Sequence, residues 1–348
     1  MRRNSGKRKA ELHNETPLQY SAAVPDLAHA LSIAIAAAEA AEKILLKHFR
    51  KDLHISTKSS PRDLVTQVDR EAQAAIIEVI LKEFPDHGFI TEETVDSEHA
   101  ARLQKNAQSR YQWIIDPLDG TTNFIHGKKE FGTMIALWEC PNAANIDEPL
   151  KNTTPLLGII HQPLEQRRFE GIRGKGAFVC LDASALLSTS STSRVISRVT
   201  PSTQCEGCIE GSRLVTRHDT TPKNIVENPL KLRITKNMLD AILCTNMVAR
   251  GKPDEKDMLQ VAVPYCGSLH NYGCAAFEQG AILLGENDGV FYDGVGLWDF
   301  AAAALLIEEA GGKVRWESKD PKDIRSKVRC VASTAPIFKE LCAFLFGE

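Results

Sequence analysis

Apolar residues recur at helical spacing near the start of the chain. Between Asp26 and Arg50, Leu27, Leu31 and Leu45 fall on one face, and Lys and His residues gather at the end of the run. A period near 3.6 residues with cationic residues in the last turn predicts an amphipathic helix. The same period predicts a second helix over residues 69–84, which Pro85 ends.

Short apolar runs bounded by turn residues predict strands, and three later runs predict helices. The expected strands are Phe89–Thr91, Trp113–Ile115, Phe131–Trp138, Leu156–His161, Arg168–Ile172, Ala241–Thr245, Gly289–Tyr292 and Val328–Ser333. The expected later helices are Gly273–Gly285, Asp299–Ala310 and Ile337–Phe346. Helices and strands mix without strict alternation, which indicates a layered α/β or α+β architecture.

The same pattern divides the chain into four segments. Residues 1–22 are polar with a basic start and no following apolar run, so we expect a mobile N-terminal tail. Residues 23–180 form an N-terminal α+β part, and residues 233–348 form a C-terminal α/β part. Between them, residues 181–232 include a Ser/Thr-rich stretch, which predicts a variable insertion or loop region.

Composition adds little chemistry but excludes some classes of protein. With 348 residues, 25% charged residues and a net charge of −3, the chain has no strong field for nucleic acid, and no apolar run is long enough for a membrane span. Nine cysteines are scattered, and Cys205 and Cys208 form a lone C-x-x-C without a second pair at zinc spacing. This favours buried free thiols in a reducing cytoplasm.

Carboxylates stand where the expected strands end or helices begin. They are Asp69, Glu92, Asp116, Asp119 and Asp299. Pro117 fixes a turn between Asp116 and Asp119, so both carboxylates can point into one site. Packed carboxylates repel each other unless a cation lies between them, and an all-oxygen set suits Mg²⁺ or Mn²⁺.

The residues after Asp119 suit a phosphate. Gly120 lets the backbone approach an anion closely, and a helix starting here would offer free N–H groups to it. Two metal ions roughly 3.5–4 Å apart can activate a water and stabilise the leaving oxygen. Thr121 can orient that water, with Asp69 holding the Thr hydroxyl.

Each of these residues also has a purely structural explanation. Asp299 and Asp69 each precede or begin an apolar helix and can simply cap it. Glu92 and Glu93 can form a solvated turn, and the run from Asp116 to Thr121 can be a tight turn. Only their occurrence together favours a metal site.

Two motifs resemble the signatures of the inositol monophosphatase family. The first is Trp113-Ile-Ile-Asp-Pro-Leu-Asp-Gly-Thr-Thr-Asn-Phe124, and the second is Trp298-Asp-Phe-Ala-Ala302, which continues to Glu309-Ala-Gly-Gly312. Further matches in order and spacing are Lys58-Ser-Ser-Pro61, Asp63-Leu-Val-Thr66 with Asp69, Ile90-Thr-Glu-Glu93 and Arg173-Gly-Lys-Gly-Ala-Phe178. The resemblance covers roughly residues 26–178 and 265–345.

The resemblance implies a layered αβαβα sandwich shared with fructose-1,6-bisphosphatases, a homodimer, and Mg²⁺-dependent, Li⁺-sensitive hydrolysis. It implies that Glu92, Asp116 and the Leu118 carbonyl hold a first Mg²⁺, that Asp116, Asp119 and Asp299 hold a second, and that Glu92 serves a weaker third. It makes Thr121 and Asp69 catalytic. The positions it implies for substrate contact are Glu92, Leu118, Asp119, Gly120, Thr121, Gly273, Cys274, Ala275, Asp293 and Asp299.

Three departures from the family pattern concern the substrate. The acid that binds substrate hydroxyls in the inositol phosphatases is replaced by Tyr292, with Asp293 one position away, and an expected Arg appears as His270. Phe131-Gly-Thr133 and Gln162-Pro163 resemble the histidinol-phosphate phosphatases instead. The expected substrate is inositol-1-phosphate or a similar polyol phosphate. Histidinol phosphate, a 3′-phosphonucleotide and a sugar bisphosphate are the alternatives.

A hypothesis from another class keeps the fold as a binding surface for the transcription machinery. The basic tail and the segment 182–232 are its support, and the complete set of candidate metal ligands speaks against it.

Overall fold

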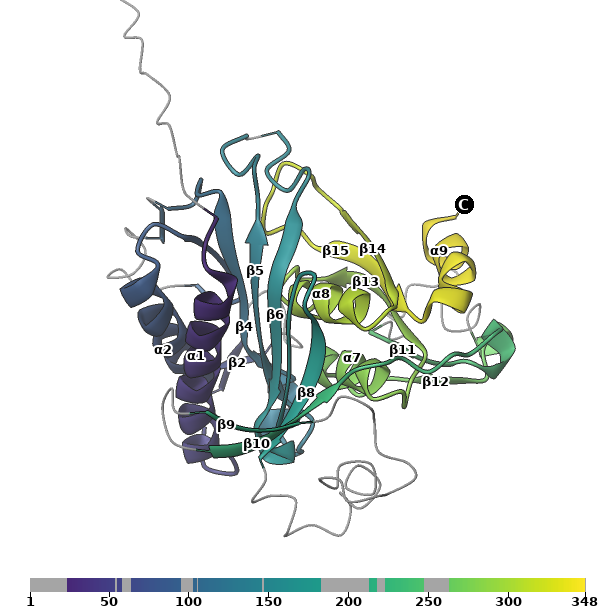
Figure 1. Cartoon of the computed structure of the whole chain (residues 1–348), viewed down its shortest axis with the longest axis horizontal. Coiled ribbons are helices and arrows are strands. Elements are labelled where there is room, and N and C mark those ends of the chain that lie inside the picture. Colours follow the sequence, from purple (N-terminus) through teal and green to yellow (C-terminus); the bar gives the residue numbers. More distant parts are fainter. Residues whose placement is uncertain are drawn as a thin grey trace, which may run out of the picture.

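The computed structural model describes residues 24–53, 55–57, 64–94, 103–104, 106–145, 147–182, 213–217, 223–246 and 263–347. Within them two larger sheets and the helices form successive layers (Figure 1). The expected tail 1–22, the Ser/Thr-rich stretch 188–203 and the pair Cys205 and Cys208 lie outside the described residues.

The larger sheet has eight strands in the order β3-β4-β5-β6-β7-β8-β10-β9. The pair β3 and β4 is parallel and the other pairs are antiparallel. Its strands are β3 (Gly88–Thr91), β4 (Tyr111–Asp119), β5 (Gly132–Glu139), β6 (Thr154–Gln162), β7 (Arg167–Ile172), β8 (Gly176–Asp182), β9 (Arg213–Arg217) and β10 (Lys223–Pro229). The last two lie in the segment expected to be an insertion, and they extend this sheet at its edge.

The second sheet has five strands in the order β12-β11-β13-β15-β14. Strand β11 runs parallel to β12 and β13, and the other neighbours are antiparallel. Its strands are β11 (Ile242–Thr245), β12 (Ser268–His270), β13 (Gly289–Val295), β14 (Lys313–Ser318) and β15 (Val328–Ser333). A separate two-stranded ribbon pairs β1 (Ile55–Thr57) with β2 (Leu64–Thr66).

Helices fill the space on and between the sheets. They are α1 (Leu27–His48), α2 (Gln67–Glu83), the short α4 (Thr121–Ile125), α7 (Ala275–Leu283), α8 (Ala301–Glu309) and α9 (Phe338–Phe346), with 3₁₀ turns η1 (Pro163–Glu165), η4 (Met238–Asp240), η5 (Val263–Tyr265) and η6 (Ala335–Ile337). Asp26 caps α1 by accepting from the N–H groups of Ala28 and His29.

Three hydrophobic clusters confirm the αβαβα order of layers. One joins α1 and α2 to one face of the large sheet, the second joins α7 and α8 to its other face and to the second sheet, and the third joins α9 to the far face of that sheet. Side chains alternate across β4, so Trp113 and Ile115 face the first cluster while Ile114 faces the second. Every residue of β4 is buried for this reason.

The sheet and α8 approach each other most closely at Gly158 of β6. A Cβ added at Gly158 would lie 2.5 Å from the Ala302 carbonyl oxygen. This contact places the start of α8, and with it Asp299, against the large sheet. Among the described residues seven cysteines are free thiols, and six of them are buried, as expected. None of the described helices has both the length and the apolar character required to cross a bilayer.

Candidate metal centre

Asp116 and Asp119 come from an irregular end of β4. The expected strand ends at Asp116, but the observed strand continues to Asp119, and its pairing with β5 shifts between these two residues. The Leu118 N–H donates to Asp116 Oδ1 at 3.0 Å, and the Thr133 hydroxyl donates to the Pro117 carbonyl at 3.0 Å. This bulge turns both carboxylates toward one place, because an extra residue re-aims the side chains that follow it.

Asp299 joins them from the turn before α8. One carboxylate oxygen each of Asp116, Asp119 and Asp299 lies within 4.8 Å of the others. Asp299 does not cap α8: the helix begins at Ala301 after Phe300, while Asp299 Oδ2 accepts from the Gly296 N–H at 2.8 Å. The capping explanation for Asp299 is therefore wrong, and its second oxygen is left to the acidic group.

Burial and mutual repulsion shift the pKa of all three carboxyls upward. Burial is the largest cause in each case, and it raises the pKa of Asp119 and of Asp299 to about 6. The pKa of Asp116 lies well above its usual range because burial is joined by the charges of Glu92, Asp119 and Asp299. Glu92 thus lies close enough to act on Asp116, although it is outside the group of three. A buried, all-oxygen set with unbalanced charge fits a hard divalent cation.

These shifts predict how stability without metal depends on pH. The ordinary pKa of Asp119 and Asp299 is 3.8, so between that value and about 6 the folded protein binds more protons than the unfolded chain. Each rise in pH through this window therefore favours unfolding. We expect the metal-free wild type to lose thermal stability, relative to an Asp299→Asn variant, as pH rises from about 4 to about 7.

The measurement is thermal unfolding of both proteins in chelator and in Mg²⁺ across this range. Because the cation takes the place of the lost protons, Mg²⁺ should raise the wild-type Tm more at about pH 7 than at about pH 5. The metal-site assignment would be contradicted if the Tm of the wild type and of the variant changed with pH in the same way and Mg²⁺ changed neither.

Asp69 and Thr121 meet beside this group. Asp69 Oδ2 accepts from the Thr66 N–H at 2.8 Å and from its hydroxyl at 2.6 Å, which forms a capping box at the start of α2. Asp69 Oδ1 lies 2.9 Å from the Thr121 hydroxyl, which is also 3.1 Å from the Leu118 carbonyl oxygen. Asp69 therefore caps its helix and orients Thr121 with the same carboxylate.

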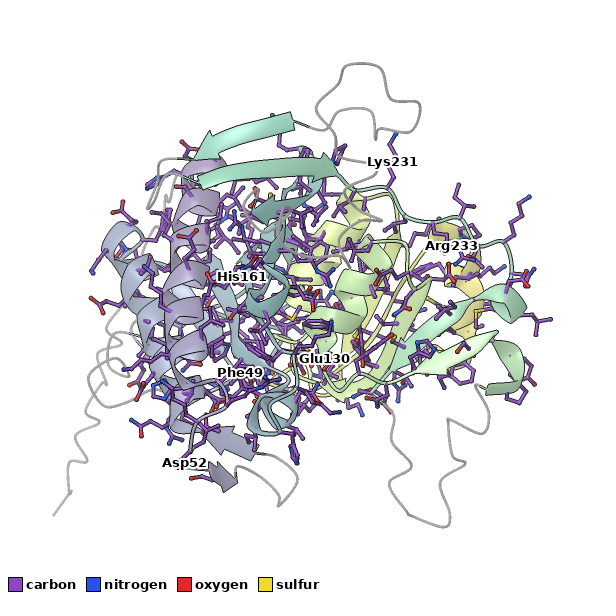
Figure 2. The ribbon with its side chains drawn as sticks, turned by 90° about the horizontal axis from the view of Figure 1, so that it is seen from below. Phe49, Asp52, Glu130, His161, Lys231 and Arg233 are labelled. Atoms are coloured by element: carbon purple, nitrogen blue, oxygen red, sulfur yellow. The ribbon has the colours of Figure 1, made fainter. Side chains whose placement is uncertain are left out.

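Gly120 sets the backbone between Asp119 and the short helix α4. Its φ is +82°, and a Cβ there would lie 2.8 Å from the Glu130 carbonyl oxygen, so this position requires glycine. Phe124 of α4 packs against Phe49 and Phe131, at ring distances of 5.6 and 5.0 Å. Figure 2 labels Phe49, which follows the end of α1. The amides of Gly120 and Thr121 are thereby held next to the carboxylates.

The segment from Gly273 to Ala275 lies against Asp119 at the start of α7. The expected helix begins at Gly273, but α7 starts at Ala275, and Gly273 has a φ of +66°. The Cys274 thiol donates to Asp119 Oδ2 at 3.0 Å, and the Ala276 N–H donates to the same oxygen. Two of the three predicted substrate positions, Gly273 and Ala275, are at least partly exposed, and Cys274 is buried.

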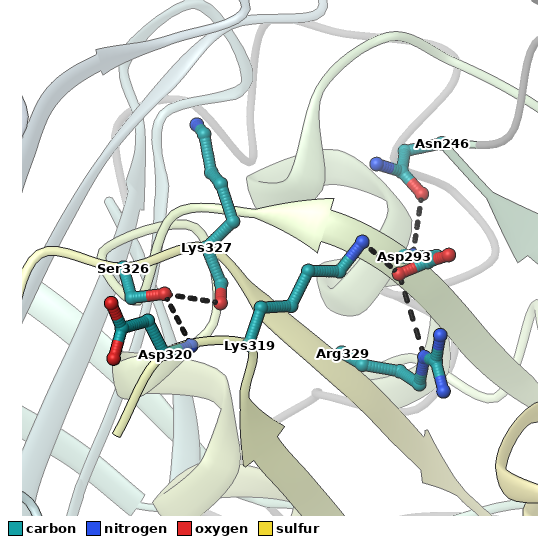
Figure 3. A network of polar contacts seen from close by, with 7 residues as sticks. All are labelled: Asn246, Asp293, Lys319, Asp320, Ser326, Lys327 and Arg329. Carbon is teal, nitrogen blue, oxygen red and sulfur yellow. Dashed lines mark hydrogen bonds and ion pairs between the residues drawn. The ribbon is translucent and has the colours of Figure 1, made fainter. Parts of the chain in front are cut away.

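Asp293 is held elsewhere. Its carboxylate accepts from Lys319 and Arg329, and its N–H donates to the Asn246 side chain at 3.1 Å (Figure 3). Burial raises the pKa of Asp293, but the hydrogen bonds and charges of Lys319 and Arg329 outweigh it and hold the pKa below its usual range. The structure thus joins Asp293 to two cations and not to the three-carboxylate group.

Comparison with known proteins decides the family. The model of the inositol monophosphatase family matches residues 26–346. The chain belongs to this family.

Two relatives and one solved structure show how far the likeness to the inositol monophosphatase family extends. Nus factor SuhB of Pasteurella multocida is 30% identical over 291 residues, which cover 82% of this chain and 84% of the relative. Inositol monophosphatase 1 of Sus scrofa is 27% identical over 304 residues, which cover 87% and 89%. An IMPase structure from Thermotoga maritima matches with a TM-score of 0.62 at 21% identity, over 92% of this chain and 97% of that one.

Other residues at the centre were not expected from the sequence. Glu278, buried on α7, accepts from the Tyr292 hydroxyl at 2.5 Å and from the Tyr272 N–H at 2.8 Å, so it anchors the segment that contacts Asp119. Burial is the main cause that raises the pKa of Glu278 to about 7. Arg325 donates to the Glu92 carbonyl at 3.0 Å. Only the unusual acid within an apolar helix run signalled Glu278, and nothing in the local sequence signalled Arg325.

Proposed function

We propose that this protein is a Mg²⁺-dependent phosphatase of small phosphate monoesters. The observation that supports it best is the buried group of Asp116, Asp119 and Asp299, with the paired Thr121 and Asp69 beside it. Three carboxylates from two parts of the chain meet here, and neither a turn nor a helix cap needs such an arrangement. Family membership points to the same chemistry.

The proposal assigns roles to the residues of the site. Glu92, Asp116 and the Leu118 carbonyl hold a first Mg²⁺, Asp116, Asp119 and Asp299 hold a second, and Glu92 serves a weaker third; Mn²⁺ can substitute. When bound, these ions lower the pKa of a bound water and balance charge on the phosphate. The Thr121 hydroxyl, fixed by Asp69, orients the attacking water. The amides of Gly120 and Thr121 hold the phosphate oxygens.

For the substrate, the Sus scrofa relative named inositol monophosphatase 1 favours a polyol phosphate such as inositol-1-phosphate. Gly273, Cys274 and Ala275 line the leaving-group side in this proposal. The cation pairing of Asp293 argues against its use as a hydroxyl acceptor, so histidinol phosphate and 3′-phosphonucleotides remain in the test.

A phosphate-release assay tests the proposal with inositol-1-phosphate, histidinol phosphate and 3′-phosphoadenosine 5′-phosphate. We expect release that requires Mg²⁺ and is suppressed by Li⁺. The substrate with the highest kcat/KM identifies the leaving group. Absence of release from all three at millimolar Mg²⁺ would overturn the enzymatic function.

A second function is favoured by the name of one relative, Nus factor SuhB. In that case the fold serves as a binding surface for the transcription machinery. A pull-down with an Asp116→Asn variant distinguishes the two: a partner retained by the inactive variant supports binding. We further propose that the protein is a cytoplasmic homodimer; light scattering of the purified protein tests the dimer, and cell fractionation tests the compartment.

A further inference from the structure

The hairpin formed by β14 and β15 is strongly cationic. Residues 313–329 contain seven Lys or Arg residues and three acidic ones, a net charge of +4 in a chain whose total is −3. The hairpin includes the edge strand of the second sheet. Its Arg329 contacts Asp293, and its Arg325 contacts the Glu92 carbonyl. A local excess of positive charge beside an acidic centre requires an explanation.

Several of these cations are neutralised by nearby carboxylates. The pairs are Arg315 with Glu317, Lys319 and Arg329 with Asp293, and Lys322 with Asp147. Arg325 and Lys327 differ: neither has an ion pair with a carboxylate of the described residues. Figure 3 shows the Lys327 side chain extending away from Asp293, Lys319 and Arg329.

Arg325 and Lys327 both lie against the residue that precedes Asp299. The Arg325 guanidinium and the Lys327 ammonium are each 5.6 Å from the centre of the Trp298 ring. Arg325 also donates to the Glu92 carbonyl at 3.0 Å. Both side chains are exposed, so each can reach a ligand in solvent. The two cations therefore stand at the rim of the metal centre.

The loaded centre does not require these two charges for its own neutrality. Its four carboxylates, Glu92, Asp116, Asp119 and Asp299, carry four negative charges, and two divalent cations balance them. The groups that could accept a substrate hydroxyl nearby are engaged: Asp293 by two cations and the buried Tyr292 hydroxyl by Glu278. Arg325 and Lys327 thus offer two cations that have no ion pair with a described carboxylate, and few hydrogen-bond acceptors for a substrate hydroxyl are free nearby. This favours an anionic leaving group over a neutral polyol.

We propose that Arg325 and Lys327 form an anion-binding rim that holds a second phosphate of the substrate, so that the preferred substrates carry two phosphate groups. This inference rests on the proposed phosphatase activity. One phosphate lies on the metal centre, and the other lies on the β14–β15 hairpin. A sugar bisphosphate and a phosphonucleotide share this chemistry.

Matched substrate pairs test the rim, because each pair keeps the scissile phosphate and removes the other. The pairs are fructose 1,6-bisphosphate with fructose 1-phosphate, and 3′-phosphoadenosine 5′-phosphate with adenosine 3′-phosphate. In the wild type we expect kcat/KM to be about tenfold higher for the two-phosphate member of at least one pair. The pair that shows the preference distinguishes a sugar from a nucleoside.

The variant is Lys327→Met, and Lys322→Met is its matched control on the same hairpin. Lys322 is exposed and pairs with Asp147. We expect Lys327→Met to remove most of the preference for the second phosphate, mainly through KM, and Lys322→Met to leave it unchanged. Arg325 donates to the Glu92 carbonyl, and the charge of Lys327 acts on Asp299. The readout is therefore the ratio of kcat/KM within each pair, which an effect on the metal centre alone leaves unchanged, and Lys327→Glu should reverse the preference.

Two results would overturn the inference while leaving the phosphatase intact. One is equal kcat/KM for both members of both pairs. The other is an equal loss on both members in Lys327→Met, which would mean that the cation acts on the scissile phosphate. Inositol-1-phosphate is assayed beside the four compounds. Release from inositol-1-phosphate alone would also overturn the inference, whereas no release from any of the five would count against the phosphatase function itself.

Discussion

The Asp116→Asn variant is expected to lose at least about a thousandfold in kcat/KM, the largest effect of any single substitution in the chain. Asp116 would contact both metal ions, and burial together with the charges of Glu92, Asp119 and Asp299 raises its pKa. Asparagine has the same size but one oxygen and no charge, so it can satisfy the Leu118 N–H and still fail as a bridging ligand. The loss should appear in kcat and in the Mg²⁺ concentration required.

The same substitution should stabilise the metal-free protein. Removal of one buried charge relieves repulsion among the remaining carboxylates, so the Tm in chelator should rise while the rise caused by Mg²⁺ shrinks. An exposed counterpart, Asp147→Asn, should change neither activity nor Tm. Activity near the wild-type level in Asp116→Asn, at any Mg²⁺ concentration, would exclude the proposed metal centre.

Removal of the Thr121 hydroxyl is expected to lower kcat by about a hundred- to ten-thousandfold with little change in KM. The hydroxyl lies 2.9 Å from Asp69 Oδ1 and 3.1 Å from the Leu118 carbonyl oxygen, a geometry that fixes the direction of its lone pairs. Thr121→Ala deletes this group, and Thr121→Ser keeps it. Serine should therefore restore most of the rate, and steady-state kinetics of the two variants measure the difference.

The Asp69→Asn variant tests whether Asp69 acts through Thr121. If Asp69 acts through Thr121, the double variant Asp69→Asn/Thr121→Ala should be no slower than Thr121→Ala alone. Asp69 also completes the cap of α2, so a loss of about 0.5–2 kcal/mol in unfolding free energy is expected separately. Multiplicative losses in kcat would show that the two residues act independently.

The helices and central strands were predictable because burial imposes a clear pattern on them. The expected β15, Val328–Ser333, agrees with the observed strand at both ends. The strand β14 was missed because its sequence, from Lys313 to Ser318, is mixed and partly exposed at a sheet edge. The strands β9 and β10 were missed within a polar segment because they are defined by strand pairing, of β10 with β8 and of β9 with β10, and not by an apolar pattern.

The residues of the candidate site that belong to local motifs were predictable from the sequence. Asp116, Asp119 and Asp299 meet as expected, because the two signatures place them at the end of β4 and before α8. The contact of Cys274 with Asp119 joins residues 155 positions apart, and local sequence has no signal for such a contact. For Asp69, capping and orientation of Thr121 had been alternatives, and the two oxygens of one carboxylate perform both.

Asp116 and Asp119 of the candidate metal centre lie on β4, one of the most enclosed strands of the fold. Each residue of β4 is enclosed between two helical layers, so its amides should exchange hydrogen only on near-global unfolding. Arg325 and Lys327 lie in the exposed connection between the edge strand β14 and its neighbour β15, where substitution disturbs few neighbours. Under the proposed function, substitutions at Arg325 and Lys327 would change which alcohol is released, while the enclosed strand would keep Asp116 and Asp119 in place.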